Sequence, residues 1–341
     1  MLLVASRLHA QTAPADAAEY CRALHFYVGD HFESAVVIVG GLTVDDLKRS
    51  ATAVSTCSDV PSTIEASVML VTELAMRQRT TTVQVVQAHL ELAASLLDRL
   101  PKPRPGNAAA DRVLRFREEW HVLASSLLLV WTDPGRAASF ADRGLHAAPG
   151  SARLHTLYGM ALEMGAHVFD NNLHDRVNIA TLPRNPARGS LVLAEPQFRK
   201  ALTLDPDADE ARVHLGRVLF LRQQNKDARE AFAYVIEKEH ASPCWRYLAH
   251  LFAGAVDELE HEWPSARQHY AQALAISSDR QTPYVALSFV EQAMGHEARA
   301  RELVETWSQR RMSEQDDPWW DYQNGGVDEE AFTWLRAQVV K

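Results

Sequence analysis

The amino-acid sequence predicts an all-α protein, a helical-repeat solenoid of about five to six antiparallel helix pairs with an aromatic cap at the C-terminal end. Three observations carry this prediction. Long segments repeat apolar residues every three or four positions, which is the spacing of an amphipathic helix. No hairpin dipeptide separates two alternating apolar runs, so the sequence gives no sign of paired strands. Small residues and alanines recur at intervals of 34 in the second half of the chain.

The bulk composition limits the classes of function. The 341 residues include 47% hydrophobic and 23% charged residues, a composition that folds. This length favours two domains or one extended array. The formal net charge of −9 repels phosphate backbones, so we expect no nucleic-acid partner. No apolar run reaches the ~18–20 residues that span a bilayer, so we expect no transmembrane segment.

Residues 1–14 allow two interpretations. The stretch Leu8 to Ala10, ahead of Gln11, resembles the end of a cleavable signal, but the charged and fully apolar regions of a signal peptide are missing. This segment is therefore either the remnant of a truncated signal peptide or an ordinary disordered terminus. The first interpretation predicts a periplasmic or secreted bacterial protein, and the second a cytoplasmic one.

The three cysteines, Cys21, Cys57 and Cys244, form no C-x-x-C pair, and their number is odd. Neither a disulfide framework nor a zinc site is expected from this pattern. We expect the three residues to be small, buried apolar side chains.

Residues 15–110 are predicted to form degenerate helical repeats. Thr43 is a natural N-cap, followed by acidic residues in the first turn of its helix. Ala23, Tyr27 and Ala35 suggest one helix pair. The remaining helical periodicity covers residues 64–77 and 83–100.

Residues 111–310 carry the clearest repeats. In the stretch 198–232, Leu215-Gly216 lies in one predicted helix, Ala228 and Phe232 lie in the next, and a turn at Asp205-Pro206 precedes both. This pattern resembles the tetratricopeptide repeat, a helix–turn–helix of about 34 residues. The resemblance covers about Trp120 to Arg310 and weakens toward the N-terminus.

The spacing between motif residues supports the resemblance. Three pairs are each 34 residues apart: Ala194 and Ala228, Ala266 and Ala300, Gly254 and Ser288. Three further pairs are each 12 apart: Gly216 and Ala228, Gly254 and Ala266, Ser288 and Ala300. A small residue in the first helix allows the second helix to approach, and the aromatic residue four positions after the alanine fills the remaining gap. His240 and Ser278 depart from the pattern, because each stands where a closing proline is expected.

One repeat is interrupted by an insertion. Gly159 and Ala194 are 35 residues apart where 12 are expected, so about 23 residues are added, and we place the inserted loop at about 167–189. The loop contains the best candidate metal ligands, His167, Asp170, His174 and Asp175. Their spacing fits no common metal motif, so we expect a solvated polar loop, no metal and no cofactor.

No sequence motif indicates catalysis. Phosphate-binding and dinucleotide-binding glycine motifs, the hydrolase nucleophile motif and the zinc-protease motif are all missing. No pattern nominates both a catalytic base and a group that would orient it, so we expect a protein that is not an enzyme.

The resemblance implies that the first helix of each pair lines a concave groove in which peptides bind. By register, the groove residues are Thr156, Met160, Glu163, Val213, Arg217, Phe220, Val285, Phe289 and Gln292. This lining is mostly apolar, and only Arg217 is of the kind that clamps a carboxylate in family members. We therefore expect either an amphipathic helix or apolar peptide of a protein partner in the groove, or a core covered by the insertion or the C-terminal tail.

The function expected from these observations is a protein–protein interaction scaffold without catalysis of its own. The alternatives are a structural subunit of a bacterial envelope complex, or a metal-binding or enzymatic site built by the inserted loop.

Residues 311–341 are predicted to form a cap segment and a final helix over 328–339. A terminal helix pair has no neighbour to cover its apolar face, and Trp319, Trp320 and Tyr322 could supply that cover. Gly325-Gly326 allows a sharp turn into the final helix, in which Trp334 could join the aromatic cluster.

Overall fold

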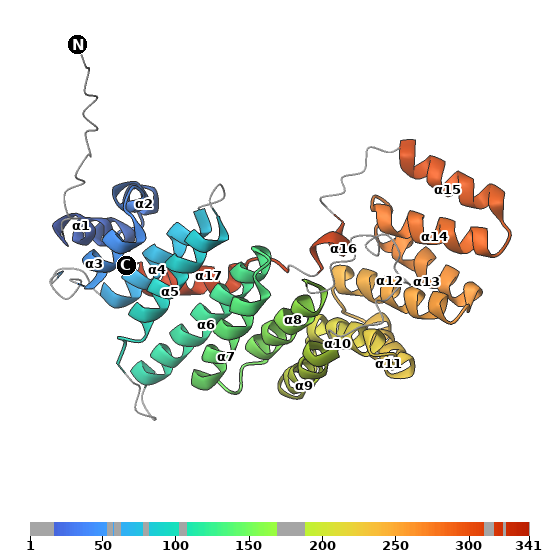
Figure 1. The fold of residues 1–341 in the computed structure, drawn as a ribbon, viewed down its shortest axis with the longest axis horizontal. Coiled ribbons are helices and arrows are strands. Elements are labelled where there is room, and N and C mark those ends of the chain that lie inside the picture. The colour runs from blue at the N-terminus through green and yellow to red at the C-terminus, as the bar shows by residue number, and fades with distance from the viewer. Residues whose placement is uncertain are drawn as a thin grey trace, which may run out of the picture. The chain divides into compact units, whose positions relative to one another are not determined.

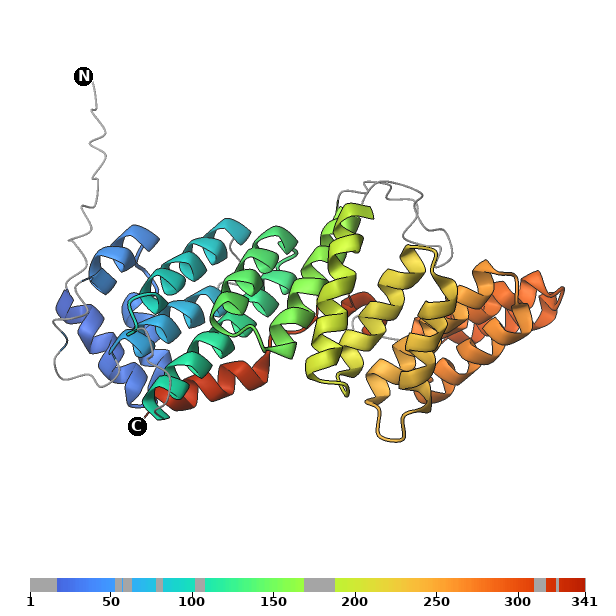
Figure 2. The ribbon, with the colours of Figure 1, turned by 90° about the horizontal axis from the view of Figure 1, so that it is seen from below.

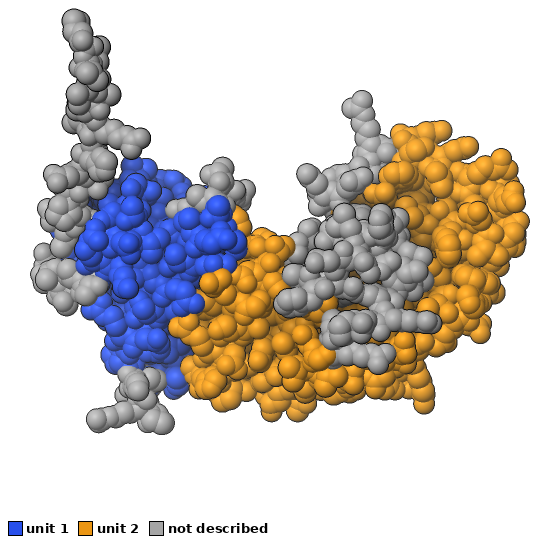
Figure 3. Space-filling model, viewed as in Figure 1, with its two compact units in different colours: residues 1–120, 329–341 blue, residues 121–328 orange. Residues whose placement is uncertain are grey.

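The computed structural model describes residues 17–52, 57, 63–77, 82–101, 108–168, 188–309, 317–322 and 325–340. Every regular element within these ranges is an α-helix, which confirms the predicted all-α class (Figure 1). The chain divides into two compact units (Figure 3). Unit 1 comprises Met1–Trp120 and Glu329–Lys341, and unit 2 comprises His121–Asp328. Among the helices described, none is long and apolar enough to cross a lipid bilayer.

Unit 1 is built from segments that are far apart in the sequence. Its helices are α1 (Ala17–Val28), α2 (Phe32–Val39), α3 (Val44–Thr52), α4 (Thr63–Arg77), α5 (Val83–Leu97), the first part of α6 (Ala108–Val130), and α17 (Glu329–Val339). Helices α1 and α2 pack as one pair, and α4 and α5 pack as another. Helix α17 packs against α4, although more than two hundred residues separate them in the sequence (Figure 2). The Arg112 Nη2 atom donates to the Gln338 carbonyl oxygen at 3.2 Å, and the Arg336 guanidinium lies 3.1 Å from the centroid of the Phe32 ring.

The predicted N-cap at Thr43 is confirmed. The Asp46 N–H donates to Thr43 Oγ1 at 3.1 Å, and the Asp46 carboxylate accepts from the Thr43 N–H at 3.2 Å. This reciprocal pair satisfies backbone donors that the first turn of α3 leaves without a helical partner.

The interior of unit 1 contains paired polar groups. The Tyr27 hydroxyl donates to the Glu73 carboxylate at 2.9 Å, and the Trp120 indole N–H donates to Thr72 Oγ1 at 2.9 Å. Burial and the neighbouring Glu73 charge hold the pKa of the Tyr27 hydroxyl well above its usual value. These hydrogen bonds remove the penalty of burying polar groups between α1, α4 and α6.

The cysteine prediction is wrong. Cys21 on α1 and Cys57 form a disulfide, with Cα atoms 5.4 Å apart and a sequence separation of 36 residues. Cys244 is free and exposed rather than buried. Local spacing and an odd number of cysteines do not exclude a bond between two residues that folding brings together.

Unit 2 contains the predicted repeats. After the rest of α6, its helices are α7 (Pro134–Ala147), α8 (Ala152–Val168), α9 (Arg188–Leu204), α10 (Asp209–Leu221), α11 (Asn225–Glu237), α12 (Pro243–Leu259), α13 (Trp263–Ile276), α14 (Gln281–Ala293), α15 (Glu297–Gln309) and α16 (Pro318–Asp321). Helices α8 to α15 pack as successive pairs: α8 with α9, α10 with α11, α12 with α13, and α14 with α15 (Figure 2).

The glycines of the repeat are required by close contact with an aromatic ring in the second helix. A Cβ atom built at Gly216 would lie 2.5 Å from a ring carbon of Phe232, which is too close for any side chain. The same relation holds for Gly159 with Phe198 and for Gly254 with Tyr270. These three contacts confirm the tetratricopeptide-type packing predicted from the spacing of the motif. In the α14–α15 pair, Ser288 replaces the glycine and Val304 replaces the aromatic residue.

The predicted insertion lies between α8, which ends at Val168, and α9, which begins at Arg188. Residues 169–187 lie outside the described residues, and so does the side chain of His167. The candidate ligands His167, Asp170, His174 and Asp175 therefore remain a prediction. Among the described residues, no group of three or more histidine, cysteine, aspartate or glutamate side chains is placed to hold a metal ion.

Candidate peptide-binding face of unit 2

The nine predicted groove residues lie on the first helices of three pairs: Thr156, Met160 and Glu163 on α8; Val213, Arg217 and Phe220 on α10; Val285, Phe289 and Gln292 on α14. We call the surface formed by these residues, together with His214, Tyr247, Phe252 and Thr282, the first-helix face. Its α14 residues are open, since Val285 is 41% and Phe289 47% exposed. The predicted residues of α8 and α10 are buried, except that Arg217 keeps partial exposure.

Residues Asp317–Tyr322 cover the α10 and α12 part of this face. They include the short helix α16, which lies beside α12 (Figure 1). Asp317 is the N-cap of α16, and its carboxylate accepts from the Trp319 N–H at 3.0 Å. The cap places the side chains of Trp319 and Tyr322 against the first-helix face.

Asp317 is a buried anchor for this segment. It has no solvent exposure, and its carboxylate accepts from the Tyr247 hydroxyl at 2.9 Å. It also accepts from Thr282 Oγ1 at 2.7 Å and from the Thr282 N–H at 3.1 Å. Burial and the Asp317 charge together hold the pKa of the Tyr247 hydroxyl far above its usual value. The three donors from α12 and α14 satisfy a charge that would otherwise be too costly to bury.

Two aromatic side chains form the rest of the contact. Tyr322 is 5% exposed and stacks on His214, with ring centroids 4.3 Å apart and an interplanar angle of 21°. The edge of Tyr322 also meets Phe252, with centroids 4.9 Å apart. Trp319 packs on Phe252 at 5.1 Å. The centroid distances of these three ring pairs lie within the range at which aromatic pairs add stability beyond the area they bury.

A buried ion-pair network lies beneath Tyr322. The Glu163 carboxylate accepts from Arg217 Nη1 at 2.5 Å, from His214 Nδ1 at 2.7 Å and from the Tyr322 hydroxyl at 3.1 Å. Burial by itself raises the pKa of Glu163, but the ion pairs with His214 and Arg217 outweigh it and lower the pKa to about 2. The carboxylate therefore stays charged and presents an acceptor to the tyrosine.

Residues 325–328 contact helices that precede α10 in the chain. A Cβ atom built at Gly325, whose φ is +57°, would lie 3.2 Å from Met160 Cε on α8. The Asp328 N–H donates to Ser126 Oγ at 3.0 Å, and the Asp328 carboxylate pairs with Arg153 at 2.6 Å. Residues 317–322 and 325–328 thus contact α14, α12, α10, α8 and α6 in the reverse of their order in the chain.

The aromatic side chains of this segment pack, as the sequence indicates, but against the interior helix pairs; the segment contacts the last pair through Asp317 and Thr282. Trp319 and Tyr322 cover the interior pairs, while Val285, Phe289 and Val304 of the last pair remain 41%, 47% and 48% exposed. The side chain of Trp320 lies outside the described residues.

Trp334, which was expected near the cluster, belongs to unit 1. Its ring lies 4.4 Å from the Arg115 guanidinium. The final helix therefore contributes its tryptophan to the other unit.

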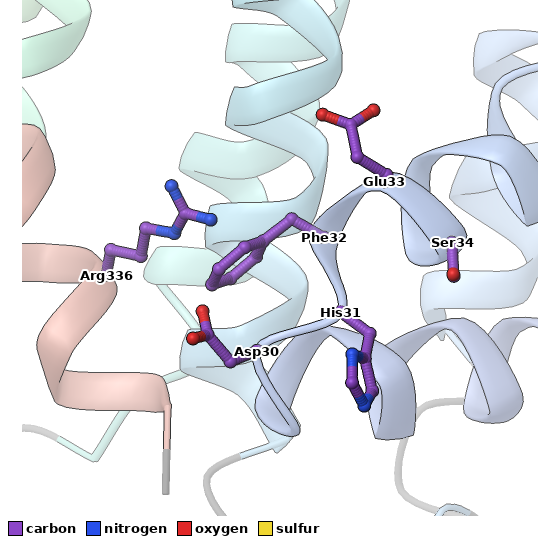
Figure 4. A pocket seen from close by; sticks show the side chains of 6 residues that line it. All are labelled: Asp30, His31, Phe32, Glu33, Ser34 and Arg336. Carbon is purple, nitrogen blue, oxygen red and sulfur yellow. The ribbon is translucent and has the colours of Figure 1, made fainter.

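A separate hollow of about 280 Å³ lies in unit 1 (Figure 4). It is lined by Asp30, His31, Phe32, Glu33, Ser34 and Arg336. The Asp30 carboxylate points toward Phe32 and Arg336, whereas the His31 ring points away from these two side chains (Figure 4). These side chains do not converge as a nucleophile, a base and an orienting acid would.

No family model and no curated protein matches the sequence. Among solved structures, MamA residues 41-end from Desulfovibrio magneticus RS-1 is 16% identical, covering 57% of this chain and 94% of its own, with a TM-score of 0.43. The pilF protein of Pseudomonas aeruginosa is 13% identical, covering 65% of this chain and 84% of its own, with a TM-score of 0.47. Human IFIT1, as a dimer with PPP-AAAA, is 13% identical, covering 85% and 68%, with a TM-score of 0.41. The tetratricopeptide-type assignment rests on the helix pairs of unit 2 and the glycine–aromatic contacts within them.

Proposed function

We propose that this protein is a protein–protein interaction scaffold that binds a peptide or helix of a partner protein along the first-helix face of unit 2, without catalysis of its own. The observation that carries this proposal is the exposed apolar surface of α14. Val285 and Phe289 are 41% and 47% exposed, and they continue a face on which the chain's own segment is already held. Exposed apolar patches of this kind mark interaction sites more often than they mark inert surface.

The chemistry of the open surface favours a protein partner. The Phe289 ring meets the Trp263 ring edge-on at 6.3 Å, so two aromatic side chains border it. Aromatic and aliphatic side chains suit the apolar face of a helix or an extended apolar peptide. The net charge of −9 supports a protein rather than a nucleic acid as the partner.

A role as a structural subunit of a bacterial envelope complex is a second candidate, and one observation favours it. The Cys21–Cys57 disulfide is of the kind that persists in oxidising compartments such as the periplasm or the outside of the cell. A metal-binding or enzymatic role for the inserted loop has no such support among the described residues.

Site-specific photo-crosslinking tests the scaffold proposal. A benzophenone amino acid at Phe289 should form a covalent adduct with one partner protein in the native cells. The same probe at Val37 on α2, which is 78% exposed, is the control and should not form that adduct. The identified partner, once purified, should bind wild-type protein at least ten times more tightly than a Phe289→Asp variant, as expected when a charge enters an apolar contact.

Two results would contradict the scaffold proposal: probes at Val285, Phe289 and Gln292 that give no partner adduct, or a partner whose affinity does not change with Phe289→Asp. The envelope-complex role would be favoured by a different result. In that case, probes at Val37 and at Phe289 would form the same adduct equally well, and the crosslinked protein would copurify with this chain in a fixed proportion.

A further inference from the structure

The contacts of Asp317–Tyr322 are those of a bound peptide. One charged and two aromatic side chains enter separate positions on the first-helix face: Asp317, Trp319 and Tyr322. Building on the interaction role proposed above, we propose that this face recognises the pattern D-x-W-x-x-Y, that residues Asp317–Tyr322 occupy it as an intramolecular ligand, and that the partner is a protein segment with the same pattern that displaces them.

The aspartate position selects a short carboxylate. Its donors, the Tyr247 hydroxyl and the hydroxyl and N–H of Thr282, lie within 3.1 Å of the Asp317 oxygens. Tyr247 is fully buried and Thr282 is 6% exposed, so the donors are held in place. A neutral side chain there would weaken three hydrogen bonds to a charged acceptor at once.

The second aromatic position selects tyrosine over phenylalanine. The ring of Tyr322 is held by His214 and Phe252, and its hydroxyl reaches the Glu163 carboxylate at 3.1 Å. The Arg217 guanidinium lies 5.1 Å from the same ring, within the range of a cation–π contact. A phenylalanine would keep the stacking but lose the hydrogen bond to a buried charge.

The face has the chemistry of a recognition surface rather than of a core. Its floor contains Glu163, His214, Tyr247 and Thr282, all of which are less than 9% exposed. Burying ionic and hydroxyl groups adds less stability than burying apolar ones, but it discriminates strongly against a ligand that leaves them unpaired.

The helix pairs have their own core contacts beneath this face. The contacts of Gly216 with Phe232 and of Gly254 with Tyr270 lie between the two helices of one pair and do not involve residues 317–322. Repeat arrays are stabilised mainly within pairs and between adjacent pairs. We therefore expect unit 2 to stay folded when the segment leaves its place.

Covalent linkage makes the segment a strong competitor. A ligand attached to its own protein acts at an effective concentration of about 1 mM or more, so a free peptide of equal intrinsic affinity binds only weakly while the segment is bound. A partner must therefore supply additional contacts. Val285 and Phe289 can provide these contacts. They are exposed and lie on α14, C-terminal to Thr282, which is the residue of α14 that the segment contacts.

The test measures the binding of a fluorescein-labelled peptide with the sequence of residues 315–324, QDDPWWDYQN, by anisotropy. In the full chain, the triple variant Asp317→Ala/Trp319→Ala/Tyr322→Ala should bind the peptide at least ten times more tightly than the wild type does. A peptide with alanine at the same three positions should not bind. Adding Thr282→Val to the triple variant should weaken binding at least fivefold, while Thr306→Val on the exposed surface of α15 should leave it unchanged.

Three results would overturn the proposal. The first is a folded triple variant that does not bind the peptide, and the second is a wild type that binds it as tightly as the triple variant does. The third is a dimeric wild type in which protection of the segment depends on protein concentration, because the occupant would then come from a second copy. Each of these would leave the crosslinking result at Phe289 unaffected, so the scaffold role can survive when the recognition pattern fails.

If the triple variant does not fold, hydrogen–deuterium exchange of the wild type tests whether the peptide displaces residues 317–322. With the unlabelled peptide at about 1 mM, the amides of Trp319 to Tyr322 should exchange faster, as the segment is displaced. Unchanged exchange would overturn the proposal.

Discussion

Helices α10 and α14 contribute matching positions of the repeat to the first-helix face, yet the solvent exposure of their side chains differs. Val213 on α10 has no solvent exposure, whereas Val285 at the matching position of α14 is 41% exposed. Among the described contacts, the segment that ends at Tyr322 reaches α14 at Thr282 and reaches α10 at His214 and Arg217. Helix α10 also packs against the first helices on both sides of it, α8 and α12, whereas α14 belongs to the last helix pair. Matching positions of the repeat therefore differ in exposure according to the elements packed against them.

The largest expected effect lies in the packing beneath the two faces. Gly216→Ala would place a Cβ atom 2.5 Å from the Phe232 ring and should lower the free energy of unfolding by about 2–3 kcal/mol. Ser288→Ala, at the matching position of α14, should change it by less than about 0.5 kcal/mol because Ser288 already carries a Cβ atom. Urea denaturation of both variants measures the difference, and equal effects would show that the α10 pair is no more tightly packed than the α14 pair.

The second effect concerns the charge held under the covered face. The folded-state pKa of Glu163 is about 2, below that of an exposed glutamate. Its stabilising contribution is therefore complete above the unfolded pKa of about 4.3 and is lost as the pH falls toward 2, by up to about 2–3 kcal/mol. Glu163→Gln should flatten the dependence of the unfolding free energy on pH in that window.

The control for this charge is Gln292→Glu, which adds a carboxylate at the matching exposed position of α14. It should introduce no new loss of stability between pH 4.3 and 2. A Glu163→Gln protein that keeps the full acid sensitivity of the wild type would mean that other carboxylates determine it.

The smallest effect tests the hydroxyl that joins the segment to α8. Tyr322→Phe removes the hydrogen bond to Glu163 and should weaken the hold on the segment by about 1 kcal/mol. The amides of residues 317–322 should then exchange with deuterium about five times faster, which is the same free energy expressed as a rate ratio. The amides of α14 beyond Thr282 should not change.

Tyr234→Phe is the matched control, because Tyr234 is 43% exposed on α11 and lies under the Arg212 guanidinium. Equal acceleration in the two variants would indicate a general loosening of unit 2.

The repeats could be predicted because close packing leaves a local mark on the sequence. Gly216 and Phe232 must be small and aromatic respectively for two adjacent helices to meet, and their spacing within one pair is fixed. The N-cap at Thr43 is equally local, since its partner Asp46 is three residues away. Such features are decided within a few turns of helix.

The cover of the first-helix face could not be predicted in the same way. Glu163 and Tyr322 are 159 residues apart, and no spacing rule connects them. The aromatic richness of the segment indicated that it packs somewhere, but the sequence pattern favoured the open end of the array. The Cys21–Cys57 bond escaped prediction for the same reason, because its partners are 36 residues apart and meet only in the folded chain.

The packing of α17 against α4 has a consequence for synthesis on the ribosome. The residues of α17 emerge from the ribosome only after all of unit 2 has been synthesised. While the repeats of unit 2 fold, α4, the Phe32 ring and Arg112 therefore lack their contacts with α17. Unit 1 is begun first and completed last. Translation that stops before α17 would leave the helix pairs of unit 2 intact but would expose the surface on α4 that α17 contacts in the complete fold.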